Sequence, residues 1–426
     1  MKPRFGLLWH LCWRSILNRR LSVALTVVAV GLSVAMLIGV ERLRRDARAA
    51  FAQTISGTDL VVGARGGGAQ LLLYSVFHIG NASNEISWDS VQRIASMPQV
   101  DWVVPLALGD SHRGFRVVGS TAAYFEHYRY GDRRSLAFAE GRAFGDVFEA
   151  VLGAEVAARH GYRVGDRIVL SHGAGADGTR FAEHADKPFT VVGILARSGT
   201  PVDRSVLVSL EGIAAIHVDW AGGAPIPGLS IAPEHVRKFD LRPKTVTAAL
   251  VGLKSRIAVF RVQRAINTDT AEPLSAVLPG ATLQELWNLV GMAEQALLAV
   301  SALVVAVGLA GLVAVMVAGL GERRRELAIL RALGAGPRQV FALLALESLA
   351  ASAAGIALGL ALVYGAAALA GPWLQAGYGL APSLGWPSVA ELQLLAAVFA
   401  ASLLASVLPG LRAYRYSLAD GMTIRI

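Results

Sequence analysis

Four long apolar segments set the first limit on how this chain folds. Residues 21–40 contain no charged side chain, and further apolar runs occupy residues 291–320, 341–370 and 390–409. A helix of about 20 residues crosses the ~30 Å hydrocarbon core of a bilayer, so each run can span a membrane. For the first run a cleaved signal peptide is the alternative, but the run is longer than a signal core and no small-x-small site follows it. The sequence therefore predicts four transmembrane α-helices.

Composition agrees with a membrane protein that also carries a water-soluble part. The 426 residues are 54% hydrophobic, with a mean hydropathy of +0.50 and a net charge of +9. The arginines flank the apolar runs and no aromatic-rich basic patch is present, so we expect a membrane surface and no nucleic acid as the charged partner. Cys12 is the only cysteine, which excludes an intramolecular disulfide and makes a thiol nucleophile improbable.

Residues 41–285 lie between the first two apolar runs and have the composition of a soluble domain. Strand-like and helical runs alternate there irregularly, which predicts an α+β domain joined to the membrane by helical stalks at residues 41–53 and 282–290. Gly161 stands where a helix C-cap glycine belongs. The expected strands are residues 59–63, 102–106, 115–119, 167–171, 189–195, 205–209 and 245–253, and the expected helices are residues 87–96, 150–160 and 254–266.

The charge distribution predicts the orientation in the membrane. The link 321–338 has five arginines, and the tails 1–20 and 410–426 are basic, whereas the loop 371–389 has aromatic residues and no Lys or Arg. The positive-inside rule places the tails and the link in the cytoplasm and residues 41–285 outside. Four arginines within residues 42–48 oppose this placement, although the rule weakens for long translocated domains. Residues 1–20 read as an amphipathic helix at the membrane surface.

The link 321–338 predicts a short amphipathic helix with a glycine stop at Gly334. Its pattern favours a helix held by a cytoplasmic partner over a solvated loop that only anchors topology. Its candidate contact residues are Glu322, Arg323, Arg324, Arg325, Glu326, Leu327, Leu330, Arg331 and Leu333.

No catalytic motif accompanies these features. The chain has no G-x-x-x-x-G-K-[ST], H-E-x-x-H, C-x-x-C or G-x-S-x-G pattern, so it is expected to be neither an ATPase nor another enzyme. The triple glycine at residues 66–68 follows a strand without opening a helix, which disfavours a phosphate cradle. Residues 171–187 hold the best metal-like cluster, yet a solvated hairpin loop is favoured and no metal site is predicted; the cluster contains His172, Asp177, Glu183, His184 and Asp186.

Two apolar features leave alternatives open. Gly355 and Gly359 form a small-xxx-small pair, which suits helix packing within the chain and contact with a second copy equally well. Residues 71–81 are apolar inside the soluble region. They are interpreted mainly as core, with an exposed surface for lipid, lipoprotein or a neighbouring subunit as the alternative.

The chain resembles the FtsX-like permease domain of ABC transporters of the MacB/LolC/LolE/FtsX type. The resemblance rests on RRRELAILRALGAGPRQVFALLALESLAA at residues 323–351 and LPGLRAYRYSLADGM at residues 408–422, although Ser417 replaces the usual proline. VLGAEVAARHGYRVGDRIVL followed by FTVVGIL resembles the MacB-like periplasmic domain. The order of one span, a large domain and three spans also matches.

This resemblance implies a non-enzymatic permease subunit in the bacterial inner membrane. A separate cytoplasmic ATPase dimer would bind ATP and Mg, leaving this chain without cofactors, and its groove would receive a coupling helix at residues 322–333. Glu326, Arg325 and Arg331 would make the charged contacts and Leu327, Leu330 and Leu333 the apolar ones. A second permease copy, identical or a sister, is implied, with membrane lipid and a periplasmic adaptor or lipoprotein as further partners.

The leading hypothesis is therefore mechanotransmission: ATP-driven motion moves the periplasmic domain, which exports or extracts an amphiphilic cargo such as a lipoprotein, lipid, peptide or drug. An FtsX-like regulator of a cell-wall hydrolase or sensor is the alternative within the same architecture. A membrane-anchored periplasmic enzyme or receptor is the alternative from another class.

Overall fold

The computed structural model describes residues 13–82, 84–173, 183–221, 224–322, 324–332, 334–378 and 382–415. The chain divides into two compact units. The helical unit consists of Met1–Asp46, Gly291–Gln375 and Leu380–Ile426, and the sheet unit of Ala47–Val290 and Ala376–Gly379. Cys12, Asp177 and Ser417 lie outside the described residues.

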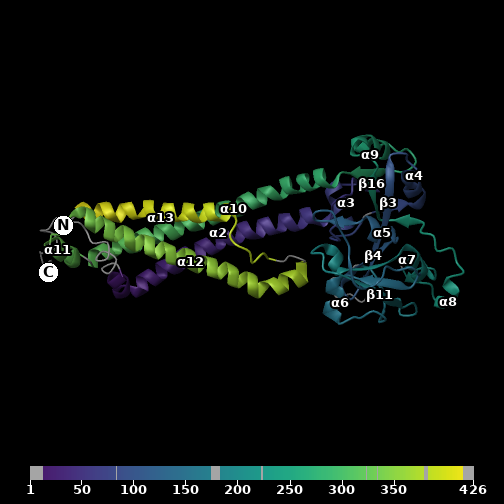
Figure 1. Cartoon of the computed structure of the whole chain (residues 1–426), viewed down its shortest axis with the longest axis horizontal. Coiled ribbons are helices and arrows are strands. Elements are labelled where there is room, and N and C mark those ends of the chain that lie inside the picture. The colour runs from purple at the N-terminus through teal and green to yellow at the C-terminus, as the bar shows by residue number, and fades with distance from the viewer. Residues whose placement is uncertain are drawn as a thin grey trace. The chain divides into compact units, whose positions relative to one another are not determined.

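Long helices build the helical unit (Figure 1): α2 (Arg20–Thr54), α10 (Pro279–Glu322), α12 (Pro337–Tyr378) and α13 (Val389–Arg415), with the short α11 (Arg324–Ala332) between α10 and α12. Among the residues that the structure describes, four segments are long and apolar enough to cross a membrane: Arg20–Ala49, Pro279–Ala318, Arg338–Leu374 and Val389–Leu408. Apolar side chains from the long helices pack into one buried cluster, which includes Val30, Val34, Ile38, Leu312, Leu395 and Val398.

One mixed sheet organises the sheet unit. Nine strands follow each other in the order β17-β1-β16-β3-β4-β12-β8-β11-β7, while β10 pairs with β3 and β9 with β11. The pairs β4–β12 and β8–β11 are parallel and the other pairs of this sheet are antiparallel. The bounds are β1 (Leu60–Ala64), β3 (Val100–His112), β4 (Phe115–Ser120), β7 (Phe138–Gly141), β8 (Glu149–Leu152), β9 (Arg167–Ile168), β10 (Ser171–His172), β11 (Phe189–Leu195), β12 (Ser205–Ser209), β16 (Ala248–Leu253) and β17 (Leu274–Val277).

Short helices and hairpins complete the unit. They are α3 (Gly68–Ser75), α4 (Trp88–Ala95), α5 (Ala123–His127), α6 (Ala154–His160), α7 (Leu210–Ile216), α8 (Pro233–Val236), α9 (Val259–Asn267), η1 (Pro201–Arg204), η2 (Arg256–Ala258), and the pairs β2 (Ile86–Ser87) with β15 (Thr245–Val246), β5 (Arg129–Tyr130) with β6 (Arg134–Ser135), and β13 (Trp220–Ala221) with β14 (Ala224–Pro225).

The alternation of side chains along the strands places hydrophobic cores on both faces of the sheet. Leu207 of β12 points into one core, whereas its neighbours Val206 and Val208 belong to another. In β1, Val61 likewise joins the first core while Leu60 and Val62 join a third. Strands covered on both faces read as continuous apolar runs, and Val206, Leu207 and Val208 of β12 fit this pattern.

Several expectations about this unit change. Residues 150–160 are not one helix, because Ala150–Leu152 lie in the buried strand β8 and the helix starts only after Gly153. A Cβ on Gly153 would lie 2.2 Å from the carbonyl oxygen of Val202, so the chain passes too close for a side chain. The triple glycine does open a helix, since α3 begins at Gly68.

Residues 245–253 form two strands, β15 and β16, instead of one. Residues 167–171 likewise belong to two strands, β9 and β10, and the expected helix 254–266 begins as the 3-10 turn η2 before α9. Other expectations agree with the structure: Gly161 ends α6 in the left-handed conformation, with φ +69°, and Leu71, Leu72, Val76 and Phe77 are buried core residues.

Candidate coupling site

α11 is attached to the ends of both neighbouring long helices. Its Leu330 packs against a small cluster from α10 and α12 that contains the buried Leu320, Val340 and Leu344. Glu326 is exposed on the same helix, as is Ile329, whose side chain is 53% exposed. The helix is therefore held on one face and accessible on another.

A glycine turn fixes how α11 ends. The amide of Ala335 donates to the carbonyl of Leu330 at 2.9 Å, and the amide of Gly334 to that of Arg331 at 3.0 Å. Together with a φ of +94° at Gly334, these two bonds form a Schellman motif, in which only glycine is unstrained. The side chain of Gln339 then accepts from the amide of Gly336 at 3.0 Å and closes the turn into α12.

The structure assigns most of the expected coupling residues to α11. Arg324, Arg325, Glu326, Leu327, Leu330 and Arg331 are part of this helix. Glu322, however, is the last residue of α10, because a charged side chain at a helix C-terminus does not by itself end the helix. Arg323 and Leu333 lie outside the described residues.

Gly355 and Gly359 lie against α2 of the same chain. A Cβ on Gly355 would approach Val30 Cγ1 to 2.7 Å, and one on Gly359 would approach Val34 Cγ1 to 2.7 Å. A Cβ on Gly31 would in turn lie 2.9 Å from Leu358 Cδ2. Small residues on both helices thus let the two backbones approach each other closely.

A buried ion pair joins α2 to α13. The guanidinium of Arg42 donates to Glu391 through Nε at 3.1 Å and through Nη2 at 3.0 Å, and the two side chains are 3% and 0% exposed. Arg42 also donates to the hydroxyl of Tyr364 on α12 at 3.1 Å. No local pattern in the sequence pairs Arg42 with Glu391, because the two residues lie 349 positions apart.

Glu391 also caps the helix on which it lies. Its carboxylate accepts from the amide of Ser388 at 3.0 Å, while the Ser388 hydroxyl accepts from the amide of Glu391 at 3.2 Å. This reciprocal arrangement is a capping box. The S-x-x-E pattern before an apolar run was therefore a readable signal for a fixed carboxylate at this helix start.

The other arginines of residues 42–48 also have partners for their positive charges within the chain. Arg45 pairs with Glu391 at 3.0 Å, and Arg44 with Glu41 at 2.8 Å. Arg48 lies over the ring of Trp287, 5.4 Å from its centroid. Since acidic partners offset much of the charge of residues 42–48, this segment is weaker evidence for a cytoplasmic location than its arginine count suggests.

Two protein-family models match the sequence of this chain. The model of the MacB-like periplasmic core domain matches residues 23–268, more than half of the chain, and that of the FtsX-like permease C-terminal matches residues 298–418. No curated protein matched the chain.

Solved structures with similarity include two extracytoplasmic domains. The periplasmic region of MacB from Actinobacillus actinomycetemcomitans matches at 11% identity and a TM-score of 0.33, covering 55% of this chain and 95% of that one. The extracellular domain of the noncanonic ABC-type transporter YknZ from Gram-positive bacteria matches at 12% identity and a TM-score of 0.29, covering 52% and 99%.

Apolar helices joined to an α+β domain by continuous helical segments define a membrane-type ABC permease. The chain belongs to the family of MacB-like and FtsX-like ABC transporter permeases. Members of this family are inner-membrane proteins with a periplasmic domain and work with an ATPase partner.

Proposed function

We propose that this chain is the permease subunit that carries ATP-driven motion from a separate cytoplasmic ATPase to its periplasmic sheet unit. The observation that carries the proposal is α11, which is packed onto α10 and α12 through Leu330 and presents Glu326 and Ile329 on its exposed side. α10 continues without a break from Pro279 to Glu322. Because an α-helix is stiff along its axis, force on α11 is passed along α10.

Contacts between α2 and α10 support a joint movement of these two helices. The ring of Phe51 meets that of Trp287 edge to face, with centroids 5.5 Å apart. Arg48, one turn earlier on α2, lies over the same indole. This aromatic contact lies in the part of each helix that belongs to the sheet unit. Two helices that hold each other there would act on the sheet together.

The polar groups of the apolar helices favour transmitted motion over a hydrophilic channel. Ser33, Ser301 and Ser402 are buried, and each hydroxyl donates at 2.8 Å to the carbonyl four residues earlier on its own helix. Serine hydroxyls bonded in this way are satisfied within a helix and do not line a water path. Cargo in this scheme is moved outside the bilayer.

The cargo that we propose is amphiphilic. Two large apolar residues are exposed three positions apart where η2 leads into α9: Ile257 is 93% exposed and Phe260 is 70% exposed. Exposed apolar side chains three residues apart form a contact for a lipid chain, an apolar peptide or a lipoprotein. Replacing Phe260 with serine should then reduce cargo release while ATP turnover by the complex persists.

The assembled transporter in this proposal contains two permease copies and an ATPase dimer that binds ATP and Mg²⁺. To test the coupling role, Glu326→Lys is co-purified with the candidate ATPase and compared with wild type and with Glu234→Lys. Glu234 is an exposed glutamate on α8 of the sheet unit, which makes it a matched control for charge reversal.

We expect Glu326→Lys to lower ATPase association and permease-stimulated ATP turnover, and Glu234→Lys to leave both unchanged. Equal association of all three proteins would reject the coupling role of α11. If association depends on Glu326 but the sheet unit captures a cell-wall hydrolase and no amphiphile, the regulatory alternative replaces transport as the output.

A further inference from the structure

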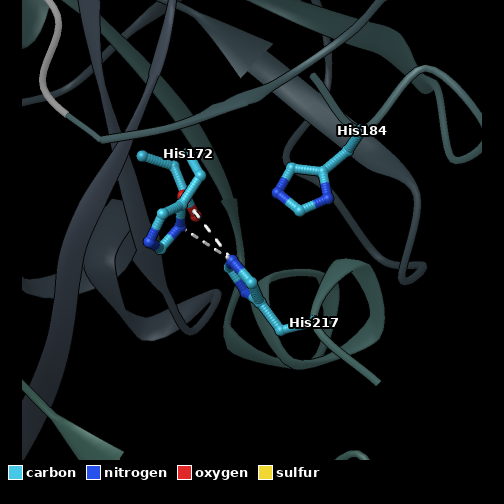
Figure 2. Close-up of side chains that lie close together, drawn as sticks. His172, His184 and His217 are labelled. Carbon is cyan, nitrogen blue, oxygen red and sulfur yellow. Dashed lines mark hydrogen bonds and ion pairs between the residues drawn. The ribbon is translucent and has the colours of Figure 1, made fainter. Parts of the chain in front are cut away.

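Three histidines and an aspartate meet in the sheet unit. Asp110 lies on β3, His172 on β10, His184 on the segment that returns to β11, and His217 immediately after α7. One ligand atom from each residue lies within 4.8 Å of the others. Figure 2 shows the three imidazole rings around a common space, each reaching it from a different stretch of chain.

The backbone fixes these positions. His172 and Asp110 are direct partners in the β10–β3 register. The amide of His184 donates to the carbonyl of Leu170 at 2.9 Å, which holds that segment beside the strand. His217 follows α7, and its Nδ1 lies 2.8 Å from the carbonyl oxygen of Ile213. The four side chains are therefore brought together by sheet pairing and helix geometry.

The spacing of three ligand atoms fits a tetrahedral metal ion. His172 Nδ1 lies 3.1 Å from Asp110 Oδ1 and 3.2 Å from His217 Nε2, and His217 Nε2 lies 3.7 Å from Asp110 Oδ1. Ligands about 2.0–2.1 Å from a tetrahedral zinc ion are about 3.3 Å apart. His184 offers the fourth ligand atom, within 4.8 Å of the other three.

The nitrogen Nδ1 of His172 faces two hydrogen-bond acceptors and carries at most one proton to share between them. The carbonyl of Ile213 can only accept, so Nδ1 of His217 is the donor and in the neutral imidazole Nε2 presents a lone pair. Such a bond from the far nitrogen to a carbonyl is how proteins orient metal-binding histidines. His172 Nδ1 has at most one proton and faces both this lone pair and the Asp110 carboxylate.

His184 supplies the independent observation. Its side chain is 0% exposed, and neither ring nitrogen has a hydrogen-bond partner among the described residues. Its ring packs on Trp220, with centroids 4.2 Å apart. A buried imidazole with no partner is costly, and coordination to a cation would satisfy one nitrogen.

The nearest ammonium group does not oppose a cation. Lys187 is fully buried, but its Nζ pairs with Asp219 at 2.7 Å and with Asp186 at 2.7 Å. With that charge compensated, Asp110 provides the net negative charge at the cluster. Side-chain exposures of 38% for His172 and 26% for His217 leave a path for an ion from solvent.

We propose that Asp110, His172, His184 and His217 form a binding site for a divalent transition-metal ion of the Zn²⁺ type. Imidazole nitrogen with one carboxylate oxygen is a donor set that suits zinc and not Mg²⁺ or Ca²⁺, which prefer oxygen ligands. Four protein ligands leave no open position, so the ion would fix the His184 segment to β3, β10 and α7 and would not catalyse a reaction.

Two of these four residues, His172 and His184, belong to the metal-like cluster in the sequence, for which no metal site was predicted. The solvated-loop interpretation is wrong for His184 and Lys187, which are buried. Glu183 and Asp186 are outside the four-residue group. The local pattern of residues 171–187 contains neither Asp110 nor His217, which lie 62 and 45 positions from His172 and join it only through the fold.

The test uses the full chain in detergent, purified with a tag that contains no histidine and stripped with EDTA. Zn²⁺ binding is measured by titration calorimetry and by metal analysis after dialysis, and Co²⁺ is added as a spectroscopic probe. Wild type is compared with Asp110→Asn, His184→Gln and His217→Gln. His235→Gln removes an exposed histidine of the same unit and is the control.

We expect one Zn²⁺ per chain for wild type and the control, a visible Co²⁺ spectrum of the tetrahedral type, and a higher Tm with Zn²⁺ but not with Mg²⁺. Loss of an orienting partner alone weakens metal affinity about 10–100-fold, so each cluster variant should lose at least that much. Absence of stoichiometric binding by wild type, or equal affinity in all variants, would overturn the site. If a variant fails to fold, the Co²⁺ spectrum of wild type remains the test: a spectrum of the tetrahedral type supports the site, and its absence overturns it.

Discussion

Arg42 and Glu391 form a bidentate ion pair inside the helical unit, although the two residues lie near opposite ends of the sequence. Both side chains are almost completely removed from solvent. A charge buried in this way depends on its partner, since desolvation is costly for each ion alone. The pair therefore fixes the register of α2 against α13, and Tyr364 adds α12 to the same contact.

Glu391→Gln should destabilise the helical unit by about 3–5 kcal/mol, because it leaves a buried guanidinium without a counter-charge. The double variant Arg42→Met/Glu391→Gln should lose much less than the sum of the single variants. Thermal unfolding of the detergent-solubilised protein measures both. Asp240→Asn, which removes an exposed ion pair with Arg242, should change Tm little. Additive losses in the double variant would contradict the pairing.

Gly359→Leu should destabilise the protein by about 1–3 kcal/mol, because overpacking forces neighbouring groups to move. A Cβ at this position would lie 2.8 Å from the carbonyl oxygen of Gly31, and a backbone atom cannot easily give way. Gly365→Leu on the same helix is the matched control, since a Cβ there meets nothing within 4 Å. Equal Tm values for the two variants would show that the close approach of α2 and α12 is not needed.

Local patterns predicted much of this architecture and few of its long-range contacts. The apolar runs predicted the long helices because about 20 mostly uncharged residues permit little else. The strand-like run FTVVGIL predicted β11 at its observed bounds. The prediction of a helix at residues 150–152 is wrong because a run of three apolar residues fits a helix as well as a buried strand, and only sheet pairing decides between them.

The candidate sites show the same difference between local features, which the sequence predicts, and long-range contacts, which it does not. The α11 link was readable because its Gly334 stop and its charges are local features. The pairing of Arg42 with Glu391, and of His172 with Asp110 and His217, depends on which elements become neighbours. A single sequence carries no local record of such pairings, although the capping box at Ser388 did mark Glu391 as a fixed carboxylate.

Gly334→Ala should reduce permease-stimulated ATP turnover. A φ of +94° strains any residue with a Cβ, at a cost of about 1–2 kcal/mol, so the turn that positions α11 would relax. Gly336→Ala is the control two residues later, because a Cβ there meets nothing within 4 Å and the Gly336 amide remains available to Gln339. ATPase assays of the reconstituted complex measure the effect. If both variants retain full stimulation, the turn geometry does not control coupling.

His78 should make the sheet unit sensitive to mild acid. Burial, followed by the nearby charge of Arg116, lowers the pKa of His78 to about 4, and its Nδ1 is hydrogen-bonded to the Ser205 hydroxyl at 2.9 Å. The unfolded chain takes up a proton near pH 6.5 and the folded chain only near pH 4. Stability from this group is therefore complete above pH 6.5 and is lost as the pH falls to about 4.

The substitution His78→Asn separates this effect from the other histidines. Asparagine stays neutral, can donate to or accept from Ser205, and tolerates the φ of +56° found at this position. Between pH 7 and pH 4.5, wild type should lose about 2 kcal/mol more stability than His78→Asn, which is measured as the difference in Tm shift. His235→Asn, at an exposed position, should behave as wild type. An identical acid response in all three proteins would mean that His78 takes up its proton equally well in the folded and unfolded chains.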